Sequence, residues 1–187
     1  MPRLFVALEL PENTREELAR IATGLPGADW VFSDDYHLTL RFIGEVDQAC
    51  FETVREGLAG IQADSFRLEL RGMGLFPLRG DPETLWAGVP KSEGLLSLRR
   101  RVESLLSRRG IPPDTRKFHP HVTLAKVKNS AEAWIGQYVA DHSLFSIPAI
   151  PIQAFSLFSS RLAPGGAIHD LEETYPLNGL LEADISD

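Results

Sequence analysis

The stretch HLTL at residues 37–40 recurs 84 positions later as HVTL at residues 121–124. Side chains alternate between the two faces of a β-strand. The histidine and the threonine of each copy therefore share one face, and the two aliphatic residues share the other. Each copy predicts a half-buried strand that lines a cleft with an imidazole and a hydroxyl: His37 with Thr39, and His121 with Thr123.

A single His-x-Thr on a strand would be an ordinary polar pair. Here the surroundings of the two phrases repeat as well, which favours a functional interpretation. Hydrophobic periodicity predicts the same order in each half: strand, helix, histidine strand, helix, strand. In the first half these elements are expected over 4–10, 11–25, 36–43, 48–60 and 66–71, and in the second over 84–89, 95–106, 120–127, 131–140 and 152–158. A glycine- and proline-rich loop over 72–82 separates the halves, an extended piece covers 167–177, and an acidic tail over 181–187 is expected to fray.

Two similar halves are most simply related by a pseudo-twofold axis, so that both histidine faces meet across one cleft. The sequence therefore predicts an α+β fold in which residues 1–187 form a single bilobal domain. The first lobe is expected at about 11–80 and the second at about 84–160, with the termini completing the sheets.

Composition restricts the class of protein. The chain has 187 residues, of which 43% are apolar and 24% are charged, values typical of a globular protein. No apolar run approaches the roughly 20 residues needed to cross a bilayer, and the short apolar start does not resemble a signal peptide. Cys50 is the single cysteine, which excludes an intrachain disulfide and fits a reducing cytoplasm.

Charge is distributed unevenly along the chain. The formal net charge is −7, which argues against a protein that coats nucleic acid nonspecifically. Residues 91–128, however, hold ten lysines and arginines against three acidic residues, a local net charge of +7 that ends at the second phrase. A phosphate-bearing ligand would suit this field. A solvated helix face is the alternative for residues 99–109.

The residue types favour acid–base chemistry over other mechanisms. His119 and His121 form a His-x-His pair, but the further ligands of a zinc site are missing from the pattern. There is also no Gly-x-Ser-x-Gly elbow and no Walker-type phosphate loop. Two opposed histidines can instead take a proton from water and give one to a leaving oxygen, while threonine hydroxyls donate to a phosphoryl group. A strained cyclic phosphodiester is a reasonable target.

HLTLRFIG at residues 37–44 and FHPHVTLA at residues 118–125 resemble the two-histidine phosphoesterase superfamily. More narrowly, the chain is similar to RNA 2′,3′-cyclic phosphodiesterases, also called 2′-5′ RNA ligases of the LigT type. Segments 3–11, 85–89, 159–162 and 166–177 share this resemblance. It implies a bilobal α+β fold with two antiparallel-rich sheets around a V-shaped cleft.

The activity implied by the resemblance is hydrolysis of a 2′,3′-cyclic phosphate at an RNA end to a 2′-phosphomonoester, without metal or other cofactor. Some such enzymes also join RNA halves reversibly through a 2′-5′ linkage. Carried over, His121 is the general base, His37 is the general acid, and Thr39 and Thr123 hold the phosphate. The expected partners are RNA ends or nucleotides that bear the cyclic phosphate. No membrane and no obligate protein partner is expected, and the protein is expected to be a monomer.

Three further positions bear on this resemblance. The family usually has arginine five positions after the second histidine, where this chain has Lys126. Strict alternation would aim Lys126 away from His121, so a role in substrate binding requires a bulge or a strand end. Arg41 is expected on the face of His37, where it could contact phosphate or form a solvent-exposed ion pair. His169 stands where the family often has tyrosine, and an exposed position near a hairpin is its simplest interpretation.

Other functions remain open at this point. The chain could hydrolyse another small cyclic or 2′-5′ phosphodiester, such as ADP-ribose cyclic phosphate or 2′-5′ oligoadenylate. It could also be a non-catalytic module that binds nucleotides or RNA ends. The presence of both histidines and both threonines argues against mere binding, which does not need two groups that transfer protons. Phe42 and Trp86 are expected in the core.

Overall fold

Strands dominate the molecule, and four α-helices pack around them within the part of the chain that the structure describes. The computed structural model describes residues 1–76, 83–128, 130–163 and 166–179. In chain order its elements are β1 (Arg3–Glu9), α1 (Glu12–Ile21), β2 (Ala28–Trp30), the 3₁₀ turn η1 (Ser33–Asp35), β3 (His37–Glu45), α2 (Gln48–Leu58), β4 (Phe66–Arg71), β5 (Met73–Phe76), β6 (Glu83–Gly88), α3 (Glu93–Arg108), β7 (His121–Val127), α4 (Glu132–Asp141), β8 (Ser146–Ile152), β9 (Ala154–Ala163) and β10 (Gly166–Pro176).

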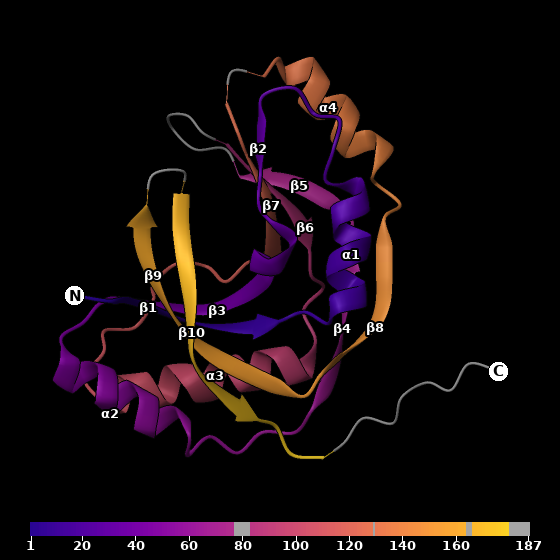
Figure 1. Cartoon of the computed structure of the whole chain (residues 1–187). Helices are drawn as coiled ribbons and strands as arrows, with labels where there is room; N and C mark the ends of the chain where they lie inside the picture. The colour runs from indigo at the N-terminus through magenta and orange to yellow at the C-terminus, as the bar shows by residue number, and fades with distance from the viewer. Residues whose placement is uncertain (77–82, 129, 164–165, 180–187) are drawn as a thin grey trace.

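One twisted sheet contains both histidine strands at its centre. Its order is β10-β9-β1-β3-β7-β6-β5, with β2 paired to β7, and β4 and β8 form a separate two-stranded ribbon. All pairings between these strands are antiparallel. Figure 1 shows β9 and β10 on one side of the molecule and β5, β6 and β7 on the other. The predicted α+β class with antiparallel sheets is confirmed.

A pseudo-twofold axis passes between the two histidine strands. β3 pairs with β7 at Leu38 and Val122, and each of these residues directly follows the histidine of its own phrase. Antiparallel pairing of equivalent positions is what a local twofold axis requires. The ribbon repeats the relation, because β4 and β8 close the two halves and pair antiparallel with each other. The predicted order of strand, helix, histidine strand, helix and strand holds in both halves.

The same β-bulge interrupts both histidine strands. In β3, Thr39 lies opposite Ala7 of β1 and Arg41 lies opposite the next residue, Val6, so that Leu40 has no partner of its own. In β7 the corresponding extra residue is Leu124. A bulge breaks the alternation of side chains. Two successive residues are therefore buried in each strand, and the side chain after them returns to the cleft face.

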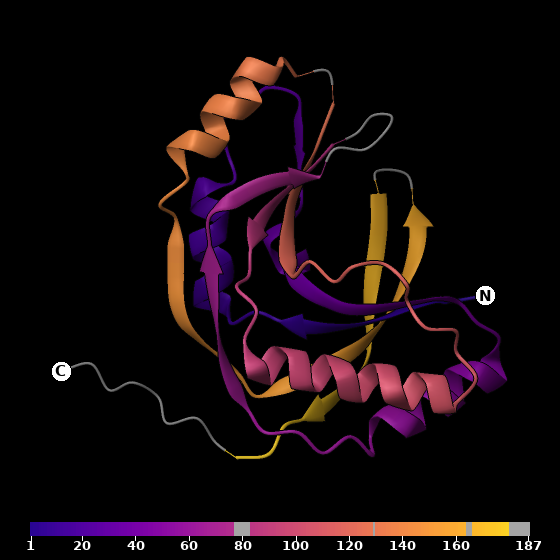
Figure 2. The same cartoon turned by 180° about the vertical axis from the view of Figure 1, so that it is seen from behind.

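Helices α2 and α3 lie side by side and run below β1 and β3 in Figures 1 and 2. Ser92 caps α3 by accepting a hydrogen bond from the amide of Leu95. The apolar face of α3, at helical spacing, is fully buried and comprises Leu95, Leu98, Val102 and Leu106. This buried face of α3 packs against the sheet at β3.

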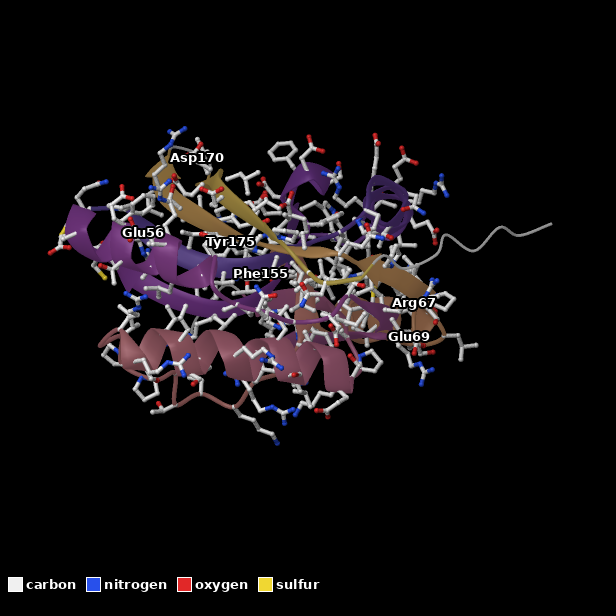
Figure 3. All side chains as sticks on the ribbon, turned by 90° about the horizontal axis from the view of Figure 1, so that it is seen from below. Glu56, Arg67, Glu69, Phe155, Asp170 and Tyr175 are labelled. Carbon is white, nitrogen blue, oxygen red and sulfur yellow. The ribbon has the colours of Figure 1, made fainter. Side chains whose placement is uncertain are left out.

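Aromatic packing closes the sheet at its other edge. Phe155 of β9 and Tyr175 of β10 stack with their ring centroids 5.0 Å apart, and both are labelled in Figure 3. The Tyr175 hydroxyl donates to the backbone carbonyl of Arg55 in α2. The last strand is thus attached to the helical layer.

Two element predictions were wrong. β5 occupies Met73–Phe76, the start of the predicted loop over 72–82, and residues 77–82 of that loop lie outside the described residues. The predicted strand over 152–158 straddles the boundary between β8 and β9. Pro148 and Pro151 made β8 hard to recognise from the sequence. β8 tolerates them because, among the described strands, it pairs with β4 alone. The acidic tail over 181–187 also lies outside the described residues. Among the described helices, none has the length and apolar character that a bilayer span requires.

Candidate active site

A central cavity of about 380 Å³ brings together side chains from both histidine strands. Thr39 enters from β3, and His121, Thr123 and Lys126 enter from β7. Within the described residues, neither threonine hydroxyl makes a hydrogen bond to protein. Both hydroxyls are therefore available to donate to a ligand.

His37 lines a second cavity of about 430 Å³, which shares Phe42 and Arg116 with the central one. The imidazole of His37 is enclosed by other rings: its centroid lies 5.1 Å from that of Phe5, 5.2 Å from that of His169 and 6.1 Å from that of Phe158. These rings come from β1, β10 and β9. They fix the ring and remove water from around it.

The same hydrogen bond orients both histidines. His37 donates from Nδ1 to the carbonyl of Asp35 at 2.7 Å, and His121 donates from Nδ1 to the carbonyl of His119 at 2.7 Å. Each acceptor lies two residues before its histidine. In the neutral imidazole this bond leaves Nε2 without a proton and ready to accept one.

Burial holds both imidazoles in the neutral form near pH 7. The pKa of His37 is lowered to about 4, chiefly by burial and in part by repulsion from His169 and His121, against the opposing effect of the hydrogen bond to the Asp35 carbonyl. Burial is also the largest cause of the lowered pKa of His121, to which the charges on His119 and Lys126 add. A bound phosphate anion acts in the opposite direction and favours the protonated forms.

Strict alternation along β7 would turn Lys126 away from His121. The bulge at Leu124 breaks this alternation, so the side chain of Lys126 reaches the central cavity. Its ammonium donates to the hydroxyl of Thr84, with Nζ and Oγ1 2.6 Å apart. Thr84 lies directly opposite on β6 and is 6% exposed. Burial lowers the pKa of Lys126. The lysine is therefore held in place although its side chain is long and flexible.

Arg41 contributes to the wall of the central cavity, but the bulge in β3 turns its guanidinium towards α3. Nε lies 2.9 Å from Oε1 of Glu103, and the guanidinium also donates to the carbonyls of Pro112 and Phe42. Arg41 is 6% exposed, so the alternative of a solvent-exposed ion pair is wrong. Its charge is used inside the fold.

Sequence reasoning missed two residues of the site, Thr84 and Arg116, and misplaced two others, Phe42 and His169. Phe42 was expected in the core, but it is 52% exposed and lines both cavities together with Arg116. Thr84 and Arg116 lie outside the two repeated phrases, and hydrophobic alternation does not indicate that they belong to the site. His169 is packed against His37 with its Nδ1 3.8 Å from Oδ1 of Asp35. It therefore belongs to the surroundings of the site.

The described residues contain no group of three or more histidine, cysteine, aspartate or glutamate side chains arranged to hold a metal ion. His119, the other half of the His-x-His pair, is occupied differently. Its carbonyl orients His121, and its ring packs against Trp86 and Phe76 at centroid distances of 4.9 and 5.2 Å.

Comparison with known proteins places this geometry in a family. The family model described as LigT like phosphoesterase matches residues 8–86 and 88–169, and each segment contains one copy of the repeated phrase. A protein of Aeropyrum pernix named RNA 2′,3′-cyclic phosphodiesterase is 43% identical over 109 residues, which are 58% of this chain and 61% of that protein.

A protein of the same name from Thermus thermophilus is 34% identical over 189 residues, which cover 95% of this chain and 91% of the relative. Among solved structures, E. coli LigT complexed with 3′-AMP is similar with a TM-score of 0.75 and 26% identity. That match covers 96% of this chain and 100% of the other.

Proposed function

This chain belongs to the LigT-like phosphoesterase family, and on that basis we propose that it hydrolyses the 2′,3′-cyclic phosphate at an RNA end to a 2′-phosphomonoester. The observation that carries the proposal is the matched pair of imidazoles. Each is oriented by a carbonyl two residues earlier, and each is accompanied by a threonine whose hydroxyl has no hydrogen bond to the described residues. The relatives named RNA 2′,3′-cyclic phosphodiesterase support the substrate class.

The reaction needs one proton acceptor and one proton donor. Nε2 of His121 takes a proton from water as the water oxygen attacks phosphorus. The bond from phosphorus to the 3′ oxygen breaks, and protonated His37 gives its Nε2 proton to that oxygen. The product carries a phosphate on the 2′ oxygen and a free 3′ hydroxyl. Because the pKa of His37 is about 4 in the free protein, the negative charge of the bound substrate is what raises it enough for this role.

The threonines and the lysine stabilise charge on the phosphoryl group. Thr39 and Thr123 donate hydrogen bonds to its non-bridging oxygens, and the ammonium of Lys126 adds a positive charge. For Arg41 we propose a structural role in place of the expected phosphate contact, because its guanidinium is paired with Glu103. No step of this scheme requires a metal ion.

Three further features belong to the proposal. The same groups would catalyse a related transesterification, in which the 5′ hydroxyl of a second RNA takes the place of water, attacks the cyclic phosphate, displaces the 3′ oxygen and forms a 2′-5′ linkage. We propose that the protein acts as a monomer. Its single cysteine, Cys50, is free, which fits action in the reducing cytoplasm.

Product analysis of an oligoribonucleotide that ends in a 2′,3′-cyclic phosphate tests the proposed function. We expect a 2′-phosphate and undiminished turnover in EDTA. His37→Ala and His121→Ala should each lower kcat by about 10² to 10⁴, with the double variant far from additive. His142→Ala, a change at the end of α4 outside both cavities, is the matched control.

A 3′-phosphate product, or loss of activity in EDTA that zinc restores, would reject the proposed chemistry. Assays with ADP-ribose cyclic phosphate and 2′-5′ oligoadenylate distinguish the nearest alternative substrates. Tight binding of the RNA end without turnover between pH 6 and 8 would instead identify a binding module.

A further inference from the structure

We propose that the outer face of α3 is a second RNA-binding surface, which holds backbone phosphates of the RNA body at a distance from the reacting end. The surface is a cavity of about 480 Å³ between α3 and the turn that follows α2. Its positive charges are those of Arg100, Arg101 and Arg108. This inference rests on the proposed function and extends it from an RNA end to a longer RNA chain.

Serine and arginine alternate in one row along this face of α3. Ser97, Arg101, Ser104 and Arg108 are separated by four, three and four positions, the spacing of neighbours on a helix surface. Arg101 and Arg108 are two turns apart, so their backbones are separated by about 10 Å along the helix axis. Two cations at this spacing suit successive phosphates of a chain better than they suit a single phosphate ion.

Arg101 and Arg108 have no carboxylate partner in the part of the chain that the structure describes. The two acidic side chains of α3, Glu93 and Glu103, are paired with other arginines. Within α3, the positions three and four residues from Arg101 or Arg108 hold only serine and leucine. Carboxylates at those positions would stabilise an ordinary solvated helix face. Their absence favours a ligand over the solvated face that the sequence left open for residues 99–109.

The other polar groups of the cavity can donate to phosphate as well. The hydroxyls of Ser97 and Ser104 and the side-chain amide of Gln62 line it, and none of them makes a hydrogen bond to another described side chain or carbonyl. No carboxylate contributes to the wall among the described residues. Guanidinium, hydroxyl and amide groups are the side chains that contact phosphate oxygens in complexes with nucleic acids. The cavity therefore combines positive charge with unused donors.

The charge of the whole chain makes this face distinctive. The formal net charge is −7 although residues 91–128 carry +7, so a polyanion is repelled by most of the protein and attracted to this segment. The substrate proposed above is itself a chain of phosphates that continues beyond its reacting end. RNA is therefore the polyanion that we assign to this surface, in preference to an acidic protein.

Helix α3 connects this surface with the candidate active site. Arg99 lines the central cavity, whereas Arg101 lines the outer one. Side chains two positions apart on a helix point about 200° apart, so these two lie on opposite sides of α3. The cavities are thus separated by about one helix diameter, roughly 10–12 Å. A dinucleotide bound in the central cavity is too short to pass around α3, but a longer RNA can reach both sites.

The experiment measures kcat/KM for a hairpin RNA and for a dinucleotide, both ending in a 2′,3′-cyclic phosphate, at several salt concentrations. Arg101→Gln should lower kcat/KM for the hairpin about fivefold at low salt and leave the dinucleotide unchanged. The slope of log kcat/KM for the hairpin against log salt concentration should become shallower by about 1. Arg20→Gln, which removes an exposed arginine of α1, is the matched control and should leave the ratio of the two substrates unchanged.

A second variant keeps the arginines. Ser104→Asp places a negative charge between Arg101 and Arg108 and should cause the same selective loss for the hairpin. Ser107→Asp adds the same charge at an exposed position of α3 outside the cavity, and it should have little effect. Turnover of the dinucleotide by each variant shows that the fold and the active site are intact.

A third readout does not depend on turnover. The fluorescence anisotropy of a labelled hairpin RNA with a non-cyclic 3′-phosphate should show weaker binding to Arg101→Gln than to the wild type. Equal effects of Arg101→Gln on hairpin and dinucleotide, or none on either, overturn the inference while the proposed function stands. Binding of polyglutamate but not of the hairpin also overturns it, because the surface would then serve an acidic protein. If the wild type hydrolyses neither substrate, the proposed function fails and the anisotropy alone decides the inference.

Discussion

At the scale of single residues, the contact between Thr84 and Lys126 explains how a lysine can stand where the family usually has arginine. An ammonium on a four-carbon chain lacks the planar fork of a guanidinium and has more freedom to lose. The buried hydroxyl of Thr84 accepts one of its three protons at 2.6 Å and leaves two for the phosphate. We therefore propose that Thr84 is a positioning residue that acts through the lysine.

Replacing Thr84 tests this role. Thr84→Val keeps the shape of the side chain but removes the acceptor, and it should lower kcat/KM roughly tenfold. Thr84→Ser should keep most of the activity. In a Lys126→Met background, Thr84→Val should have little further effect, because the interaction it removes is already absent. Equal losses in both backgrounds would show that the hydroxyl acts independently of the lysine.

At the scale of elements, the sequence predicted most of what periodicity can show. The histidine strands, α2, α3 and α4 follow their apolar patterns closely. The paired bulges could not be predicted, because a bulge depends on the register with the neighbouring strand and leaves no mark in a strand's own alternation. Because the bulges were not predicted, the orientations of the Arg41 and Phe42 side chains were not predicted either, and the access of Lys126 to the cavity had no explanation from the sequence.

The bulge in β3 also has an energetic consequence at Arg41. Arg41→Met should lower the free energy of unfolding by about 3 kcal/mol, because among the described residues it leaves the largely buried carboxylate of Glu103 with one more distant cation, Arg99 at 3.6 Å. Adding Glu103→Gln should recover part of the loss. Urea unfolding of the two variants, alongside kcat/KM, checks this. Intact stability with abolished activity would indicate a direct phosphate contact instead.

At the scale of the whole molecule, the pseudo-twofold axis determines which groups meet. Each half contributes one histidine and one threonine, and the axis between Leu38 and Val122 brings the two strands together in one sheet. We propose the lobes as residues of about 11–80 and about 84–160, with the termini completing the sheets. The family match to two segments fits such a repeat.

Placing a histidine in this enclosed cleft should make the fold sensitive to acid. The pKa of His37 is about 4 when folded and about 6.5 when unfolded. The unfolded chain therefore binds more protons between these values, and stability falls as the pH drops from about 6.5 to 4. The contribution is up to about 3 kcal/mol. His37→Gln should remove this pH-dependent contribution. The difference in the free energy of unfolding between variant and wild type, measured with urea, should therefore change between pH 7 and pH 4.5. A difference that stays constant over this range would contradict the prediction.

The pseudo-twofold axis also has a consequence for the orientation in which a ligand with distinct 5′ and 3′ ends would bind. Two identical halves would accept a phosphodiester in either of two equivalent orientations. In this chain the halves diverge just after their bulges, where the ring of Phe42 corresponds to the ammonium of Lys126. We propose that a phosphodiester bound between the strands would meet a flat apolar ring on one side and a positive charge on the other. The difference at this one position would therefore favour one of the two orientations in which a symmetric site could bind a phosphodiester.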